Sequence, residues 1–251
     1  MRVRLKFFKY GTMKYIGHLD MLRYFQKAFR RANVPMKYSE GFNPHPVMSF
    51  AAPLGVGITS EGEYLDIETD KDVDLNALVS DINSQMVEGC EVSSARELVQ
   101  NEKKAMAAVT AADYIVYLKK ESSLLNETDV KKTVDDFMAQ DAIRVVKKTK
   151  KGEREIDLKP FVYDFKGDTF ASASFLNDLA LDIKNPEFCC ENNDPVFFLK
   201  VSCGSNDNIK PELVLTTCFE QLMDKENIFA IHRRDLYLDE YPNLKSLGEA
   251  L

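Results

Sequence analysis

The sequence contains none of the long apolar runs or targeting patterns that mark membrane and secreted proteins. Its apolar stretches, such as residues 195–199, are far shorter than the roughly 20 residues needed to cross a bilayer. Residues 1–6 alternate apolar and basic side chains and lack the continuous apolar core of a signal peptide. We therefore expect a cytoplasmic protein without a membrane partner.

Paired cysteines and the common cofactor motifs are also missing. The five cysteines are odd in number and include no Cys-x-x-Cys pair, which argues against a disulfide scaffold and the common zinc sites. The chain has no phosphate loop, no Rossmann fingerprint, no His-Glu-x-x-His and no Gly-x-Ser-x-Gly elbow. On these grounds we expect no metal site and no bound cofactor.

Charge is distributed unevenly along a chain whose net charge is −7. Residues 1–40 contain ten Lys or Arg and two acidic residues, a balance of +8 that leaves −15 for the rest. A basic segment on an acidic protein favours a polyanionic ligand.

The periodicity of residues 1–98 predicts a β-α-β-β-α-β order. Val3, Leu5 and Phe7 alternate with basic residues, as in a half-buried strand. Asp74 is placed to cap the second helix. The expected elements are a strand at 2–7, an amphipathic helix at 18–32, strands at 47–51 and 64–68, a helix after Asp74 and a strand at 90–98. This is the order of the split βαβ, or ferredoxin-like, unit.

The second half repeats this order less regularly. The expected elements are a strand at 114–118, a helix at 130–137, a hairpin at 143–146 and 156–158, an irregular stretch at 164–194, a strand at 196–201, a helix opened by Pro211 and a strand at 228–238. We therefore predict an α+β protein of two tandem ferredoxin-like units with antiparallel sheets. The units span residues 1–105 and, with an insertion, 106–251.

Four basic side chains share the polar face of the expected helix 18–32; they are Arg23, Lys27, Arg30 and Arg31. Such a stripe binds phosphates by counterion release, although an ordinary solvated helix face has the same pattern. Arg4 and Lys6 on the first strand would pair across the sheet with the outward residues Tyr64, Asp66 and Glu68. That pairing would neutralise the strand face and leave the helix and the loops as the positive surface.

The chain has only three histidines: His18, His45 and His232. A general acid–base pair is a candidate use, because histidine titrates near neutrality. His18 and His45 meet only if loop 38–46 folds back along the helix, which is roughly 20 Å long. A packing or capping role for His18 is the structural alternative.

The loop at 38–46 combines aromatic, amide and imidazole side chains with two prolines and a glycine. Such loops often carry function. Phe42 and Tyr38 would stack on bases, or they would pack the loop onto the core. Phe42, Asn43 and His45 are the side chains expected to touch a nucleotide.

Several motifs match those of one family. They are Tyr15-Ile16-Gly17-His18-Leu19-Asp20-Met21-Leu22-Arg23, Phe29-Arg30-Arg31-Ala32, Tyr38-Ser39-Glu40-Gly41-Phe42-Asn43-Pro44-His45-Pro46, Ser49-Phe50, Leu54-Gly55-Val56-Gly57, Ser60-Glu61-Gly62-Glu63-Tyr64-Leu65-Asp66-Ile67 and Ile231-His232-Arg233 with Leu236-Tyr237. In these motifs the chain resembles the radical-SAM-linked protein family, and it departs from the family at Gly17, where Ser is frequent.

The resemblance implies a cytosolic α+β protein that stands beside, or is fused to, a radical SAM protein. It also implies gene neighbours for ribosomal proteins and an RNase E/G-type ribonuclease, but no proven activity. The chain has no Cys-x-x-x-Cys-x-x-Cys run, so a radical SAM cluster would belong to the partner.

These observations predict an RNA-binding or accessory module that presents RNA, such as tRNA or rRNA, to a radical SAM partner. Arg23, Lys27, Arg30 and Arg31 would hold phosphates, and Phe42, Asn43 and His45 would touch a nucleotide. One alternative is an RNA-processing or RNA-modifying enzyme that uses His18 or His45. The other is a protein-docking subunit that binds no nucleic acid.

Overall fold

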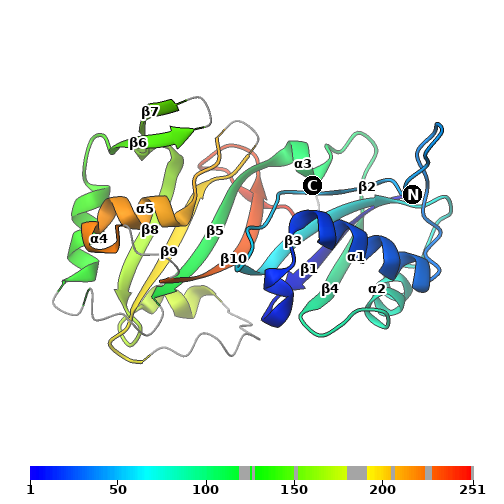
Figure 1. Ribbon diagram of the computed structural model, residues 1–251, viewed down its shortest axis with the longest axis horizontal. Helices are drawn as coiled ribbons and strands as arrows, with labels where there is room; N and C mark the ends of the chain where they lie inside the picture. Colours follow the sequence, from blue (N-terminus) through cyan, green and yellow to red (C-terminus); the bar gives the residue numbers. More distant parts are fainter. Residues whose placement is uncertain are drawn as a thin grey trace. The chain divides into compact units, whose positions relative to one another are not determined.

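A computed structural model describes residues 1–118, 125, 128–149, 152–179, 191–204, 207–223 and 228–249. The chain forms two compact units, of which the first combines Met1–Ala111 with Arg233–Leu251 and the second is Ala112–His232. Strands β5 (Val109–Leu118) and β10 (Phe229–Leu238) each contribute residues to both units (Figure 1).

The first unit has two main helices and an antiparallel sheet. Besides its parts of β5 and β10, it contains β1 (Arg2–Lys9), η1 (Gly11–Tyr15), α1 (His18–Arg31), β2 (Met48–Phe50), β3 (Thr59–Glu68), α2 (Leu75–Asn83), β4 (Cys90–Glu97), α3 (Ala105–Ala108) and β11 (Lys245–Ser246). Strand β1 lies between β3 and β4 and pairs antiparallel with both. Strands β2 and β10 both lie beside β3, and β11 pairs with β10.

Alternation along β1 places its apolar side chains in the core under α1 and α2. Val3, Leu5 and Phe7 pack with Phe25 of α1 and Ile82 of α2 in one cluster. Helix α2 begins as expected, because the Asp74 carboxylate accepts a hydrogen bond of 2.7 Å from the Ala77 amide. Both helices therefore cover the same face of the sheet, and the other face carries Arg2, Arg4 and Lys6.

A glycine lets β10 approach β3 closely. A Cβ at Gly62 would lie 2.2 Å from the carbonyl oxygen of Arg234 and 2.4 Å from the Cα of Asp235. Because no side chain fits between the two backbones, Gly62 allows β10 to bring Arg233 beside Glu63.

The second unit contains the other elements. They are α4 (Val130–Met138), β6 (Arg144–Thr149), β7 (Gly152–Asp157), η3 (Lys159–Phe161), β8 (Val162–Thr169), η4 (Ser174–Leu179), β9 (Pro195–Ser202), α5 (Pro211–Cys218) and η5 (Glu220–Leu222). Its strands follow the order β10-β5-β9-β8, while β6 and β7 form a separate hairpin. Within the described residues, no helix of either unit is long and apolar enough to span a bilayer.

The predicted α+β class is confirmed, as are the expected helices and most strands. Strand β8 falls in the stretch predicted to be irregular, and that prediction is wrong at 164–169 because β8 is held by antiparallel pairing with β9. The compact units also differ from the sequence-based division into 1–105 and 106–251. Residues Arg233–Leu251 group with the first unit because β10 runs beside β3.

Candidate functional site

The polar face of α1 is exposed, as the sequence predicted. Arg23, Lys27, Arg30 and Arg31 all have exposed side chains, whereas Phe25 on the opposite face is fully buried. The Arg23 guanidinium lies 3.1 Å from the Asp20 carboxylate, and Arg31 donates a 2.7 Å bond to the Gln85 carbonyl.

Lys27 and Arg30 are the two cations of α1 that remain available. Within the part of the chain that the structure describes, neither side chain makes a hydrogen bond or an ion pair. These two side chains are therefore better placed than Arg23 and Arg31 to meet an external anion.

The basic residues Arg4 and Lys6 of β1 lie opposite the residues of β3 that the antiparallel register predicted. Arg4 lies opposite Asp66, and Lys6 lies opposite Tyr64 with its ammonium 5.6 Å from the ring centroid. The face is also covered rather than open, because Arg4 is only 2% exposed. The charge of Arg4 is consequently not available to an external anion.

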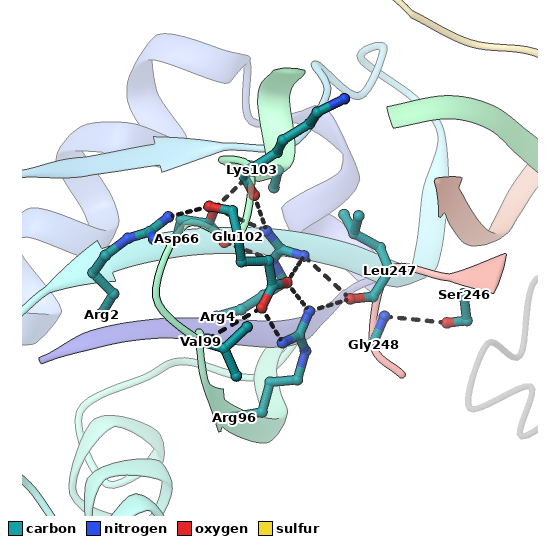
Figure 2. Close-up of polar contacts among 11 residues, drawn as sticks. Arg2, Arg4, Asp66, Arg96, Val99, Glu102, Lys103, Ser246, Leu247 and Gly248 are labelled. Atoms are coloured by element: carbon teal, nitrogen blue, oxygen red, sulfur yellow. Dashed lines mark hydrogen bonds and ion pairs between the residues drawn. The ribbon is translucent and has the colours of Figure 1, made fainter. Parts of the chain in front are cut away.

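Arg4 is the centre of a closed ion-pair network (Figure 2). Its Nε lies 2.7 Å and its Nη2 3.1 Å from the Asp66 carboxylate, and its Nη1 lies 3.2 Å from Glu102. The remaining N–H groups donate to the carbonyls of Lys103 and Leu247. All five N–H donors of the guanidinium therefore have acceptors.

A second arginine completes the network from the other side of Glu102. Figure 2 shows this carboxylate between the guanidiniums of Arg4 and Arg96, with Arg96 at 2.5 and 3.0 Å. Hydrogen bonds from Arg96 are the main cause that holds the pKa of Glu102 below its usual range. We interpret the network as structural, since its charges are paired and buried.

Residues 37–47 form a hairpin arm that begins shortly after α1, visible as the blue hairpin beside the N label in Figure 1. The arm is attached to the end of β3, because the Lys37 amide donates to Glu68 and the Glu68 amide donates to Val47. Gly41 has a φ of 113°, which suits glycine at the tip. The Phe42 side chain beside it is fully exposed, at 112%.

His45 has an internal structural role in this arm. Its ring Nδ1 lies 2.9 Å from the Ser39 hydroxyl, and its amide donates to the same hydroxyl at 3.1 Å. The Ser39 amide in turn donates to the His45 carbonyl. The same ring nitrogen lies 3.4 Å from the carbonyl oxygen of Asn43. Within the described residues, the exposed side chains of Phe42 and Asn43 make no hydrogen bond or ion pair.

His18 lies in a different place, at the mouth of a small pocket under the first turn of α1. The pocket has a volume of about 20 Å³, room for one water molecule. It is lined by Phe7, Lys9, His18, Met21, Phe50, Ala52, Leu54 and Glu63. The exposed imidazole packs edge-on against Phe50, with ring centroids 5.2 Å apart. His18 and His45 therefore occupy separate sites.

Lys9 is the unexpected residue of this pocket. Alternation from Val3, Leu5 and Phe7 continues to Lys9, so an ammonium replaces an apolar side chain on the core face. Its Nζ donates one hydrogen bond, of 2.7 Å, to the carbonyl of Ile16. Burial lowers its pKa, an effect that the negative charge of Glu63 partly offsets.

Glu63 and Arg233 form a second buried ion pair beside Lys9. The Arg233 Nε and Nη2 donate to the two carboxylate oxygens of Glu63 at 2.7 and 2.6 Å. Sequence reasoning missed all three residues as a site. The available signal was the inward position of Lys9 and Glu63, two residues before Leu65 on β3, where an apolar side chain is expected.

The third histidine, His232, is buried and belongs to the second unit, immediately before Arg233 in the chain. Within the described residues, no three His, Cys, Asp or Glu side chains gather in a way that would hold a metal ion.

Comparison with known proteins identifies a family but no characterised relative. No curated protein matches the chain. A model of a bacterial family, described as "Uncharacterized protein conserved in bacteria (DUF2344)", matches residues 2–211, which is most of the sequence. The chain therefore belongs to the DUF2344 family.

Proposed function

We propose that this protein is an RNA-binding accessory module that presents RNA to a radical SAM partner. The observation that carries the proposal is the exposed cationic face of α1, on which Lys27 and Arg30 have no partner within the described residues. Two such side chains 4.5 Å apart along the helix axis, at about 1.5 Å per residue, are suited to an extended phosphate backbone.

The hairpin arm supplies a second kind of contact. Phe42 presents its whole ring to solvent at the tip of an arm that follows α1 in the chain. Bases stack on exposed aromatic rings without sequence preference. Asn43 beside it offers both a donor and an acceptor to a base edge. The arm would hold a base while α1 holds the backbone.

The radical SAM partner rests on the resemblance of residues 15–67 to the radical-SAM-linked family, and tRNA and rRNA are the candidate ligands. We also infer that both units are ferredoxin-like. The inference is supported by the orders β4-β1-β3-β2 in the first unit and β10-β5-β9-β8 in the second, with β6–β7 inserted.

The test is a binding titration of the purified chain against total small RNA at two salt concentrations. Wild type should bind at low salt and lose affinity steeply at higher salt. The double variant Lys27→Glu, Arg30→Glu should lose binding, whereas Lys131→Glu, Lys132→Glu on the exposed face of α4 changes the charge equally and should not. Equal losses in the two double variants would remove α1 as the RNA site.

A second variant separates stacking from charge. Phe42→Ala should weaken RNA binding by about 1–3 kcal/mol and leave the salt dependence unchanged. Its thermal midpoint should equal that of wild type, because the ring touches solvent. A wild-type protein that binds no RNA at low salt, but copurifies with a radical SAM protein after nuclease treatment, would instead support a docking subunit.

An enzymatic role at His18 is the second candidate. It is favoured by the position of the imidazole at the mouth of a pocket that contains a buried lysine. His45 is a weaker candidate, because Ser39 holds its ring nitrogen. If the protein converts RNA, His18→Ala should abolish turnover and leave RNA affinity within a fewfold of wild type.

A further inference from the structure

The pocket beneath α1 contains a buried cation without a counterion in contact. Lys9 is 2% exposed, and its ammonium carries three N–H donors, yet the Ile16 carbonyl is its one hydrogen-bond partner among the described residues. Within those residues, no carboxylate oxygen lies within 4.0 Å of the Lys9 Nζ, the distance that defines an ion pair. Buried ammonium groups normally contact an anionic partner, and Lys9 lacks one among the described residues.

The nearest carboxylate is not available to complete it. Both oxygens of Glu63 accept hydrogen bonds from Arg233 at 2.6 and 2.7 Å, and both side chains are nearly fully buried. The three charged groups Lys9, Glu63 and Arg233 therefore sum to +1 inside the protein. The thiol of Cys90 adds no charge near neutrality, because burial raises its pKa to about 12.

We infer that this pocket binds a phosphate group, with one phosphate oxygen occupying the space beside the Lys9 ammonium. The pocket volume of about 20 Å³ admits a single oxygen and excludes a larger body. The other oxygens stay at the mouth, where His18 is exposed and the first turn of α1 has no side-chain cap at Gly17.

The available donors favour phosphate over a carboxylate. Planar carboxylates are best recognised by a guanidinium fork, and the fork of Arg233 is fully engaged by Glu63. The pocket offers instead a point charge at its base and an imidazole at its rim, and lysine is a common phosphate ligand in that form. The inference stands independently of RNA binding on α1.

The first experiment measures the thermal midpoint of the full chain with inorganic phosphate added at constant ionic strength. Phosphate should raise the midpoint of wild type, because a ligand that binds only the folded state stabilises it, and acetate at the same concentration should not. Lys9→Met should abolish the phosphate-dependent shift. No shift in wild type, or the same shift in Lys9→Met, would overturn the inference.

A matched pair of variants keeps the test valid if Lys9→Met does not fold. His18→Glu places a negative charge at the exposed mouth and should weaken phosphate binding at least about tenfold. Gln26→Glu adds the same charge two turns further along α1 and should change it less than about twofold. Equal effects of the two variants would mean that phosphate binds elsewhere.

The source of the phosphate is decided by competition. A 5′-phosphorylated oligoribonucleotide that displaces inorganic phosphate, when its 5′-hydroxyl counterpart does not, identifies an RNA end as the ligand. Failure of both to compete identifies a free phosphate compound. The RNA titration on Lys27→Glu, Arg30→Glu remains a separate measurement, so either proposal can fail without the other.

Discussion

The two faces of the β1–β3 pair both bury charged side chains, but the charges are treated in opposite ways. On one face, all five donors of Arg4 meet acceptors, and two carboxylates balance its charge and that of Arg96. On the other, Lys9 has one neutral acceptor and no ion pair among the described residues.

This difference distinguishes a structural charge, that of Arg4, from a charge for which we propose an external ligand, that of Lys9. A buried cation with every donor satisfied can be explained by packing alone. A buried cation beside a pocket, with one neutral acceptor, leaves a desolvation cost that the protein offsets only in part. Both residues belong to β1, so their partners, and not the element that carries them, explain the difference.

The largest expected effect comes from breaking the closed network. Arg4→Met should lower the free energy of unfolding by about 3–5 kcal/mol, because the Asp66 carboxylate loses its counterion inside the protein. Urea denaturation measures the change. Lys37→Ala removes an exposed ion pair with Glu68 and should cost less than about 1 kcal/mol. Similar costs for the two variants would show that the network contributes no more than a surface pair.

A smaller effect is expected from separating β3 and β10. Gly62→Ala places a methyl group 2.2 Å from the Arg234 carbonyl oxygen, so the strands must move apart and weaken the Glu63–Arg233 pair. Overpacking of this kind costs about 1–3 kcal/mol. Thermal unfolding of Gly62→Ala should show a lower midpoint than that of wild type. An unchanged midpoint would contradict the close packing.

The smallest effect is a pH dependence that identifies the charge on Lys9. Its pKa is lowered by burial from the ordinary 10.5, so the unfolded chain binds the proton more tightly than the folded one. Stability should therefore rise with pH from the lowered pKa up to about 10.5 in wild type relative to Lys9→Met. The neighbouring Glu63, Arg233 and Cys90 are unchanged in the variant, and their contributions largely cancel.

The difference in thermal midpoint between the two proteins, recorded from pH 7 to 10 without phosphate, measures this effect. Lys9→Met should be the more stable protein at pH 7, and the gap should close as the pH rises. A gap that widens with pH would mean that the folded state favours the charged ammonium.

Much of the first unit could be predicted because its pattern is local. The alternation of Val3, Leu5 and Phe7 indicates β1, and Asp74 marks the start of α2. The pairing of Arg4 with Asp66 follows from the antiparallel register once the fold is assumed.

The parts that could not be predicted depend on distant partners. Strand β8 lacks a period-two pattern of burial and is defined by pairing with β9. Lys9 follows three alternating apolar residues and looks like the end of a strand, because nothing local reveals that Ile16 and Glu63 enclose its ammonium. The exposed residues of α1 were predictable as a surface, but the absence of partners for Lys27 and Arg30 required the structure.

The contact between Arg4 and Leu247 has a consequence for synthesis of the protein. Arg4 donates to a carbonyl 243 positions later in the chain, and the first unit includes Arg233–Leu251. Residues 1–111 leave the ribosome long before the segment that completes their sheet. A ribosome-bound chain would therefore lack the Leu247 partner of Arg4 and the β10 neighbour of β3 until residues 233–247 have emerged, a period in which chaperones have access to that edge of β3.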